Sequence, residues 1–249
     1  MFPVTRRPSI LQVLLCLSTA ACTSGKSESV EYTECGGDTT DLIDQGYVFK
    51  DRNFACDTTP IDGDFKISDG FTTDAYIDDA SEAVVAFGAA AAVWNAGGAD
   101  VHVDLDWTAL DDDDAKSAGD NEHHVLLKAG TDPDQPNASA LTTMQPPYAS
   151  MAPTDCDIVV YWQSVISDSI EYNNWVASDP PTDAVDPDDD RRSLQMLLLH
   201  EIGHCMGFAE NRASTASVMN YGDVSLFSSM PSAVFELDSS ALKAVYGLE

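Results

Sequence analysis

The sequence predicts an α+β domain, because short strand patterns occur together with three longer helical patterns in one chain of 249 residues. Apolar residues make up 44 % of the chain, which is enough to build a sizeable core. The formal net charge is −30, and such a charge excludes nucleic acid as an expected partner, because phosphate binding requires clustered Lys and Arg.

Residues 1–22 have the features of an export signal. Arg6 and Arg7 form a basic start, the apolar run 10–17 is too short to span a membrane, and small residues precede Cys22. This arrangement resembles a bacterial lipoprotein signal, in which Cys22 would become the lipidated N-terminus. We therefore expect an exported protein, which is either a cell-envelope lipoprotein (outer membrane or surface) or secreted. Its only expected membrane contact is the N-terminal lipid anchor.

Residues 23–60 are rich in Ser, Thr, Gly and Asp with little periodicity, which predicts a linker or a small N-terminal cap. Export would place the cysteines after Cys22 in an oxidising compartment, where they are candidates for disulfides: Cys35, Cys56, Cys156 and Cys205. Four cysteines allow three pairings, and the one that closes the shorter loops joins Cys35 to Cys56 and Cys156 to Cys205. We expect residues 61–249 to form one domain.

Strand patterns occur at five places in this domain. Residues 101–107 alternate between apolar and polar side chains, which is typical of a strand with one wet face. Residues 138–144 fit an edge strand. Short apolar runs predict the other strands: 65–67, 125–127 and 157–162.

Helical patterns occur at three places. Residues 77–94 carry acids in their first turn, where the helix dipole favours them, and end before Gly97 and Gly98. Residues 191–206 follow an acidic loop whose last carboxylates can cap the helix. Residues 238–246 predict a final helix that stops at Gly247.

The second of these helices carries the residues with chemistry. In the sequence His200-Glu201-Ile202-Gly203-His204, two imidazoles lie one turn apart on one face, which lets both bind a single zinc ion. Glu201 is then in the position of a general base. The preceding residues 194–199 are mainly apolar, so the helix is buried, and two histidines and a glutamate there are costly without a metal or a paired network. The pattern therefore predicts a metal site.

The residues after His204 extend this pattern to His-Glu-x-x-His-x-x-Gly-x-x-Glu, which ends at Glu210. Gly207 can take a left-handed conformation, end the helix and return the chain toward the metal, so that Glu210 supplies a third ligand. Met219 then follows within Ser-Val-Met-Asn-Tyr. Together these features resemble the metzincin clan of zinc peptidases and its Met-turn.

Within that clan, residues 61–249 resemble the matrixin-like metallopeptidases, including their bacterial relatives. The Ala-rich helix that ends at Trp94, the segment 155–159 and the terminal segment 237–247 add to the resemblance. It implies a twisted mixed five-stranded sheet with long helices and a small C-terminal subdomain. It also implies a zinc-dependent endopeptidase that hydrolyses the peptide bonds of a protein or peptide substrate with a metal-activated water. We expect this protein to be a monomer.

The resemblance assigns a role to each residue of the site. His200 and His204 are zinc ligands, Glu201 is the general base and acid, and Met219 packs beneath the metal. Tyr221 is a candidate catalytic helper, because the Ser-x-Met-x-Tyr form also resembles astacins and serralysins, in which this tyrosine contacts zinc or the oxyanion. A buried core tyrosine is the alternative for Tyr221.

Glu210 is where the sequence departs from the family, which has His at this position. A carboxylate can ligate zinc, but it reduces the net charge of the site and makes the activated water less acidic. Asn211 and Glu236 are rival third ligands. Two functions therefore stay open: an active endopeptidase, and a surface binding protein that keeps the metzincin fold but is weakened in catalysis. The presence of Glu201 favours the enzyme, because a binding protein has no need of a general base.

Two further groups of residues are candidates for binding a second metal. We interpret His123 and His124 as surface histidines, with an accessory metal site shared with nearby aspartates as the alternative. The acid runs 111–114 and 183–190 are either solvated loops or structural Ca²⁺ sites, although neither has the Asp-x-Asp-x-Asp-Gly spacing of a calcium loop.

Overall fold

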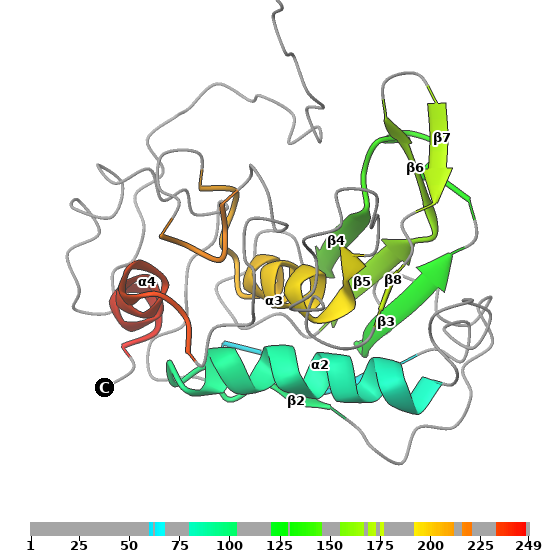
Figure 1. Cartoon of the computed structure of the whole chain (residues 1–249). Helices are drawn as coiled ribbons and strands as arrows, with labels where there is room; N and C mark the ends of the chain where they lie inside the picture. Colours follow the sequence, from blue (N-terminus) through cyan, green and yellow to red (C-terminus); the bar gives the residue numbers. More distant parts are fainter. Residues whose placement is uncertain are drawn as a thin grey trace, which may run out of the picture.

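The computed structural model describes the following residues: 60–61, 63–67, 80–103, 121–128, 130–145, 155–166, 169–172, 175–176, 192–211, 216–220 and 233–247. In these ranges the chain has a mixed α+β fold, in which helices pack against a sheet (Figure 1), so the predicted class is confirmed. The predicted signal 1–22, nearly all of the predicted cap, the pair Cys35–Cys56 and both acid runs lie outside the described residues.

The main sheet has five strands in the order β2-β1-β3-β5-β4. Neighbours among β1, β2, β3 and β5 are parallel, whereas β4 is antiparallel to β5 and forms one edge of the sheet, as predicted for residues 138–144. The bounds are as follows: β1 Asp64–Ile67, β2 His102–Val103, β3 His123–Lys128, β4 Ala140–Gln145 and β5 Asp155–Tyr161. Residues 104–107, the second half of a predicted strand, lie outside the described part.

Four short strands beyond the main sheet were not predicted from the sequence. Strands β6 (Gln163–Ile166) and β7 (Ser169–Tyr172) form an antiparallel hairpin that extends past the end of the main sheet (Figure 1). Strands β8 (Trp175–Val176) and β9 (Arg192–Ser193) form a parallel pair. Strand β9 leads directly into the helix that carries the predicted zinc motif.

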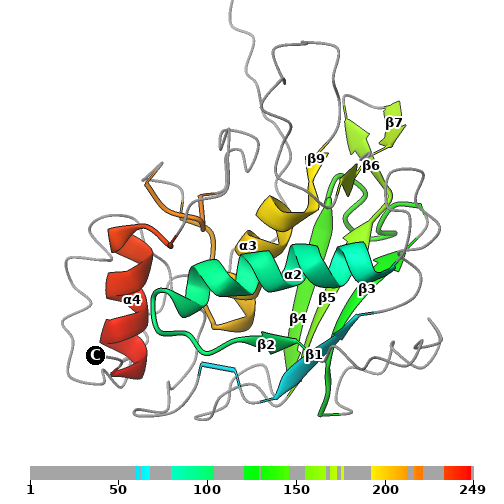
Figure 2. The ribbon, with the colours of Figure 1, turned by 60° about the horizontal axis from the view of Figure 1, so that its bottom comes forward.

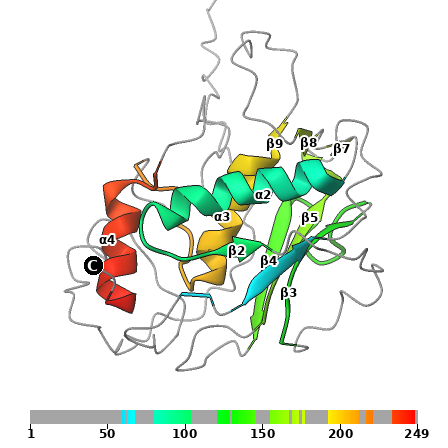
Figure 3. The same cartoon turned by 90° about the horizontal axis from the view of Figure 1, so that it is seen from below.

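Three helices are described: α2 (Ala80–Asn95), α3 (Leu194–Cys205) and α4 (Glu236–Tyr246). Helices α2 and α3 lie side by side on one face of the sheet, and α4 lies beyond its border (Figures 2 and 3). Helix α4 begins two residues earlier than expected. None of the helices in these ranges is both long and apolar enough to cross a membrane.

Helix α3 begins at Leu194 rather than at the predicted residue 191. The side chain of Ser193 caps it by accepting a hydrogen bond from the backbone N–H of Met196 at 3.3 Å. The two residues before Leu194 form β9, so they are held in an extended conformation by strand pairing. The predicted acidic cap lies outside the described residues.

The core lies between the sheet and helices α2 and α3. Strand β5 is buried along its whole length, with Ile158 and Val160 facing the helices and Val159 facing a smaller cluster on the opposite side. The indole Nε1 of Trp94 on α2 donates to the carbonyl of Leu199 on α3 at 2.7 Å, which fixes the two helices relative to each other. The apolar layer therefore holds α3 rigidly against the sheet.

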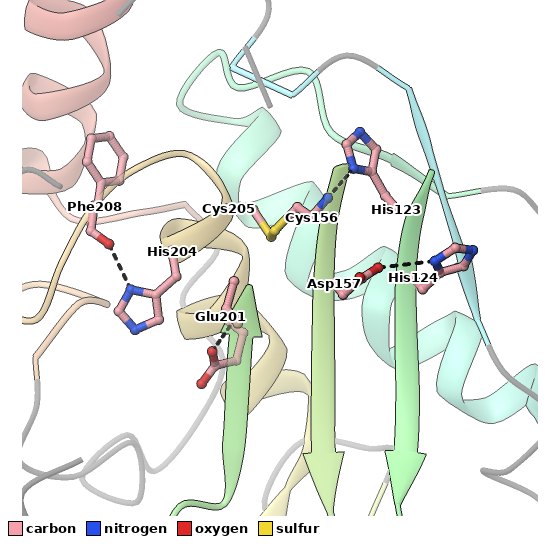
Figure 4. Close-up of a disulfide and its surroundings, with 9 residues drawn as sticks. His123, His124, Cys156, Asp157, Glu201, His204, Cys205 and Phe208 are labelled. Atoms are coloured by element: carbon pink, nitrogen blue, oxygen red, sulfur yellow. Dashed lines mark hydrogen bonds and ion pairs between the residues drawn. A yellow bond between two sulfur atoms is a disulfide. The ribbon is translucent and has the colours of Figure 1, made fainter. Parts of the chain in front are cut away.

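A disulfide joins Cys156 at the start of β5 to Cys205, the last residue of α3, as the pairing of shorter loops predicted (Figure 4). The bond ties the sheet to the helix that carries the zinc motif. It closes a loop with a sequence separation of 49 residues.

The interpretation of His123 and His124 as surface histidines is wrong. Both are only 2 % exposed, because β3 begins at His123, earlier than predicted, and is an interior strand of the sheet. The Nδ1 atom of His123 accepts the backbone N–H of Cys156 at 2.9 Å, and Nδ1 of His124 lies 3.1 Å from Oδ1 of Asp157 (Figure 4). Their ring nitrogens thus stabilise the pairing of β3 with β5.

Candidate metal centre

Helix α3 presents the three residues of the predicted zinc motif together. One ligand atom each of His200, Glu201 and His204 lie within 4.8 Å of one another. All three residues are buried, and the two imidazole rings meet edge to face with centroids 4.7 Å apart. The helical spacing that the sequence predicted therefore brings these side chains to one point.

Backbone carbonyls fix the orientation of both imidazoles. Nδ1 of His200 donates to the carbonyl of Val218 at 2.8 Å. Nδ1 of His204 donates to the carbonyl of Phe208 at 2.7 Å, as Figure 4 shows. Because a carbonyl oxygen only accepts, the proton of each neutral ring is on Nδ1, and Nε2 carries a lone pair. Metal-ligating histidines are typically held in this way.

Glu210 reaches the same point because the chain turns back after α3. Gly207 ends the helix with φ 89°, the left-handed conformation that the sequence predicted, and the N–H of Phe208 donates to the carbonyl of Gly203 at 3.1 Å. Oε1 of Glu210 consequently lies 3.3 Å from Nε2 of His200 and 3.5 Å from Nε2 of His204.

The ligand atoms of His200, His204 and Glu210 together fit a divalent metal. Two Nε2 lone pairs and one carboxylate oxygen face each other, an arrangement that repels unless a cation or a proton lies among them. The second oxygen of Glu210, Oε2, is buried and accepts no hydrogen bond from any described residue. Two imidazoles and one carboxylate make a common ligand set for catalytic zinc.

Without a metal, a proton takes the place of the cation. Burial alone would lower the pKa of His200, but the hydrogen bond and the charge of Glu210, with Glu201 and the Val218 carbonyl, raise it to about 9. Burial raises the pKa of Glu210, but hydrogen bonds and charge from His200 and His204 overcome this effect and lower it far below its usual range. The metal-free site is therefore an ion pair.

The carboxylate of Glu201 contacts the edge strand of the sheet. Its Oε2 accepts a hydrogen bond of 2.5 Å from Oγ1 of Thr142 on β4. Thr142 was not predicted as a site residue. Its signal is a polar residue at an alternate position of the predicted edge strand, between Ala140 and Met144.

Met219 lies directly under α3, where it is fully buried. A Cβ atom built on Gly203 would lie 2.2 Å from Sδ of Met219 and 2.9 Å from Cζ2 of Trp94. Only glycine therefore fits at this position of the zinc motif. The backbone N–H of Asn211 donates to the carbonyl of Met219 at 2.6 Å, which joins the turn to the segment that carries Glu210.

Asp238 on α4 stabilises the turn of residues 216–220, which carries Met219. Its two oxygens accept from Oγ of Ser217 at 2.6 Å and from the N–H of Val218 at 2.9 Å. Asp238 is completely buried. Neither Asp238 nor Ser217 was predicted as a site residue, although a serine two residues before Met219 and an aspartate in the first turn of the last helix were visible signals.

The remaining predicted site residues lie as follows. Tyr221 lies outside the described residues. Asn211 is buried, and its backbone is bonded to the Met219 turn. Glu236, the other rival ligand, is the exposed first residue of α4. Glu210 is therefore the candidate third ligand that the fold brings to both histidines.

No protein-family model and no curated protein matches this chain, and the arrangement of its own residues is what supports a function.

Proposed function

We propose that this chain is a zinc-dependent endopeptidase of the metzincin clan, with a matrixin-like catalytic domain in residues 61–249. The observation that carries the proposal is the convergence of His200 Nε2, His204 Nε2 and Glu210 Oε1 at one point, with Glu201 on the same helix. The ring orientations support it, because both Nδ1 atoms are already bonded to backbone carbonyls.

The arrangement of elements also supports a metzincin-like domain. The sheet is parallel except for its edge strand β4, the helix with the histidines packs behind that edge, and a buried methionine lies under the site. A short terminal helix, α4, stabilises the methionine turn through Asp238. The mixed sheet, its helices and the methionine under the site are features that the family resemblance implies.

In the proposed reaction, His200, His204 and Glu210 hold the metal, and Glu201 handles the protons. Zinc, when bound, supplies a Lewis acid for the scissile carbonyl and lowers the pKa of water. Glu201 takes a proton from the attacking water and delivers it to the leaving amine, which is general base and then general acid catalysis. The negative charge of Glu210 makes that water less acidic than three neutral imidazoles would.

The position of strand β4 in the sheet favours an extended polypeptide as the substrate. Among the described residues β4 forms an edge of the sheet, and an edge strand is where another strand can add by main-chain pairing. An extended peptide that adds to this edge by main-chain hydrogen bonds lies beside Glu201, because Thr142 of β4 contacts that carboxylate. Main-chain recognition suits a protein or peptide substrate.

We further propose that the protein is a monomer exported to the cell envelope through a lipidated Cys22. Mass spectrometry of the mature N-terminus tests this localisation. A diacylglyceryl group on Cys22 supports a lipoprotein, and an unmodified N-terminus beyond residue 22 contradicts the anchor.

The experiment that tests the enzymatic function measures metal and activity on the same preparation. We expect one zinc per chain and cleavage of an unfolded protein substrate, both lost on treatment with a chelator and restored by zinc. A preparation that binds zinc but cleaves no unfolded protein would refute the endopeptidase. It would leave the weakened metzincin-fold binding protein.

A further inference from the structure

We infer that Thr142 is a positioning residue that orients the carboxylate of Glu201 from the substrate-binding edge of the sheet. This inference rests on the proposed endopeptidase function, and it names a residue that the zinc motif does not contain.

The pleat of β4 turns Thr142 toward α3. Side chains alternate along a strand, and Ala140 and Met144 pack against the main core between sheet and helices, whereas Leu141 packs against the cluster on the other side. Thr142, two residues from both Ala140 and Met144, shares their face. It is the polar residue on an otherwise apolar row, where a hydroxyl requires a hydrogen-bond partner.

That partner is the candidate general base. The hydroxyl of Thr142 donates to Oε2 of Glu201 at 2.5 Å, and Glu201 is only 6 % exposed. A carboxylate held at one oxygen has less freedom to rotate, so its other oxygen, Oε1, keeps a fixed direction. A general base must lie within hydrogen-bond reach of the proton that it takes, so this restraint bears on the reaction rate.

Thr142 also belongs to the strand that we propose pairs with the substrate. The backbone of β4 would set the register of the bound peptide, and a side chain of the same strand orients the general base. One strand therefore aligns the peptide with Glu201. The neighbouring Thr143 provides a matched control, because it is exposed and lies on the opposite face of the same strand.

The first experiment measures the coupling between the two side chains without any use of activity. The unfolding equilibrium constants of Thr142→Val, Glu201→Ala, the double variant and the unchanged protein form a double-mutant cycle in urea. We expect a coupling of roughly 10-fold in the equilibrium constant, as for a hydrogen bond to a charged group. A cycle between Thr143→Val and Glu201→Ala should show none. Absence of coupling for Thr142 overturns the contact and the inference with it.

The second experiment asks whether this contact serves the reaction. With unchanged zinc content, Thr142→Val should lower kcat by about 10- to 100-fold with KM within about twofold, because it removes an outer partner of a catalytic group. Thr142→Ser, which keeps the hydroxyl, should restore most of kcat, and Thr143→Val should match the unchanged protein. If Thr142→Val fails to fold, Thr142→Ala against Thr142→Ser makes the same comparison.

Each outcome decides the inference. A kcat of Thr142→Val close to that of the unchanged protein, in the presence of coupling, overturns the positioning role. So does a failure of Thr142→Ser to restore activity. If the unchanged, zinc-loaded protein cleaves no peptide, the proposed function and the positioning role both fail, while the coupling cycle still shows whether the two side chains interact.

Discussion

The sulfur of Met219 occupies the space that any side chain on Gly203 would need, since a Cβ atom there would lie 2.2 Å from Sδ. This close approach brings residues 216–220 against α3, and the neighbouring Val218 can then offer its carbonyl to His200 at 2.8 Å. The turn of residues 216–220 thus influences the site through the position of its backbone. Its backbone orients the imidazole of His200, one of the proposed zinc ligands.

Replacement of Gly203 by Ala should therefore destabilise the protein and weaken zinc binding. Overpacking of a well-packed core costs about 1–3 kcal/mol, and here both Met219 and Trp94 would have to move. Chemical denaturation and zinc titration measure the two effects. Gly88→Ala on α2 is the matched control, because nothing lies within 4 Å of its Cβ position, and it should stabilise by about 0.5–1 kcal/mol. Equal stability of the two variants would contradict this account.

Glu210 should be required for tight zinc binding. Its Oε1 faces both Nε2 atoms, so Glu210→Ala removes a ligand and should lower the zinc affinity by at least about tenfold, whereas Glu210→His restores a ligand of the family type. Isothermal titration or competition with a chromogenic chelator gives the affinities. Glu236→Ala is the control and should bind like the unchanged protein. The reverse result, with loss only in Glu236→Ala, would overturn the metzincin assignment.

The sequence predicted those parts of the site that depend on local spacing. The one-turn separation of His200 and His204 and the left-handed Gly207 follow from helix geometry alone, and the structure has both. Thr142, Ser217 and Asp238 could not be assigned, because their roles depend on which strand and which turn pack against α3. The same limit explains His123, whose burial follows from the interior place of β3 in the sheet.

The metal-free protein should lose stability as the pH rises from about 6.5 to 9. The pKa of His200 is raised from 6.5 to about 9 in the folded state, so its contribution is complete below 6.5 and is lost as the pH rises through 9. The pKa of Glu210 is lowered, so its contribution is complete above 4.5 and is lost only in acid.

Urea unfolding of chelator-treated protein at pH 6 and pH 9 checks this prediction. Glu210→Gln removes the charge that raises the pKa of His200, so the decline should be smaller in this variant. Zinc needs a neutral imidazole, so zinc binding below pH 9 should also release a proton from the site. An identical pH dependence in both proteins would rule out the ion pair as its source.

Glu201→Ala should retain zinc and the fold but lose activity. Glu201 is not one of the proposed zinc ligands, and its carboxylate accepts a hydrogen bond from Thr142. Loss of general base and acid catalysis together with water orientation should reduce kcat by about a thousandfold or more. Zinc content by elemental analysis and turnover of an unfolded protein are measured on one preparation. Near-normal turnover would sink the mechanism.

The disulfide between Cys156 and Cys205 should supply a large part of the stability of the site. Both cysteines are fully buried, and the bond closes a loop with a sequence separation of 49 residues, for which the loss of chain entropy in the unfolded state corresponds to about 4 kcal/mol. Because Cys205 follows His204 directly and ends α3, a protein without the bond should also bind zinc less tightly.

The double variant Cys156→Ala with Cys205→Ala isolates this effect. Its free energy of unfolding should fall by about 4 kcal/mol, the value expected for a loop of this length. A reductant should bring the unchanged protein to a similar stability but leave the variant as it is, because the variant has no bond at this place to lose. If the variant were as stable as the unchanged protein, and its zinc affinity were the same, the packing of Trp94 and Met219 against α3 would suffice to hold the helix to the sheet.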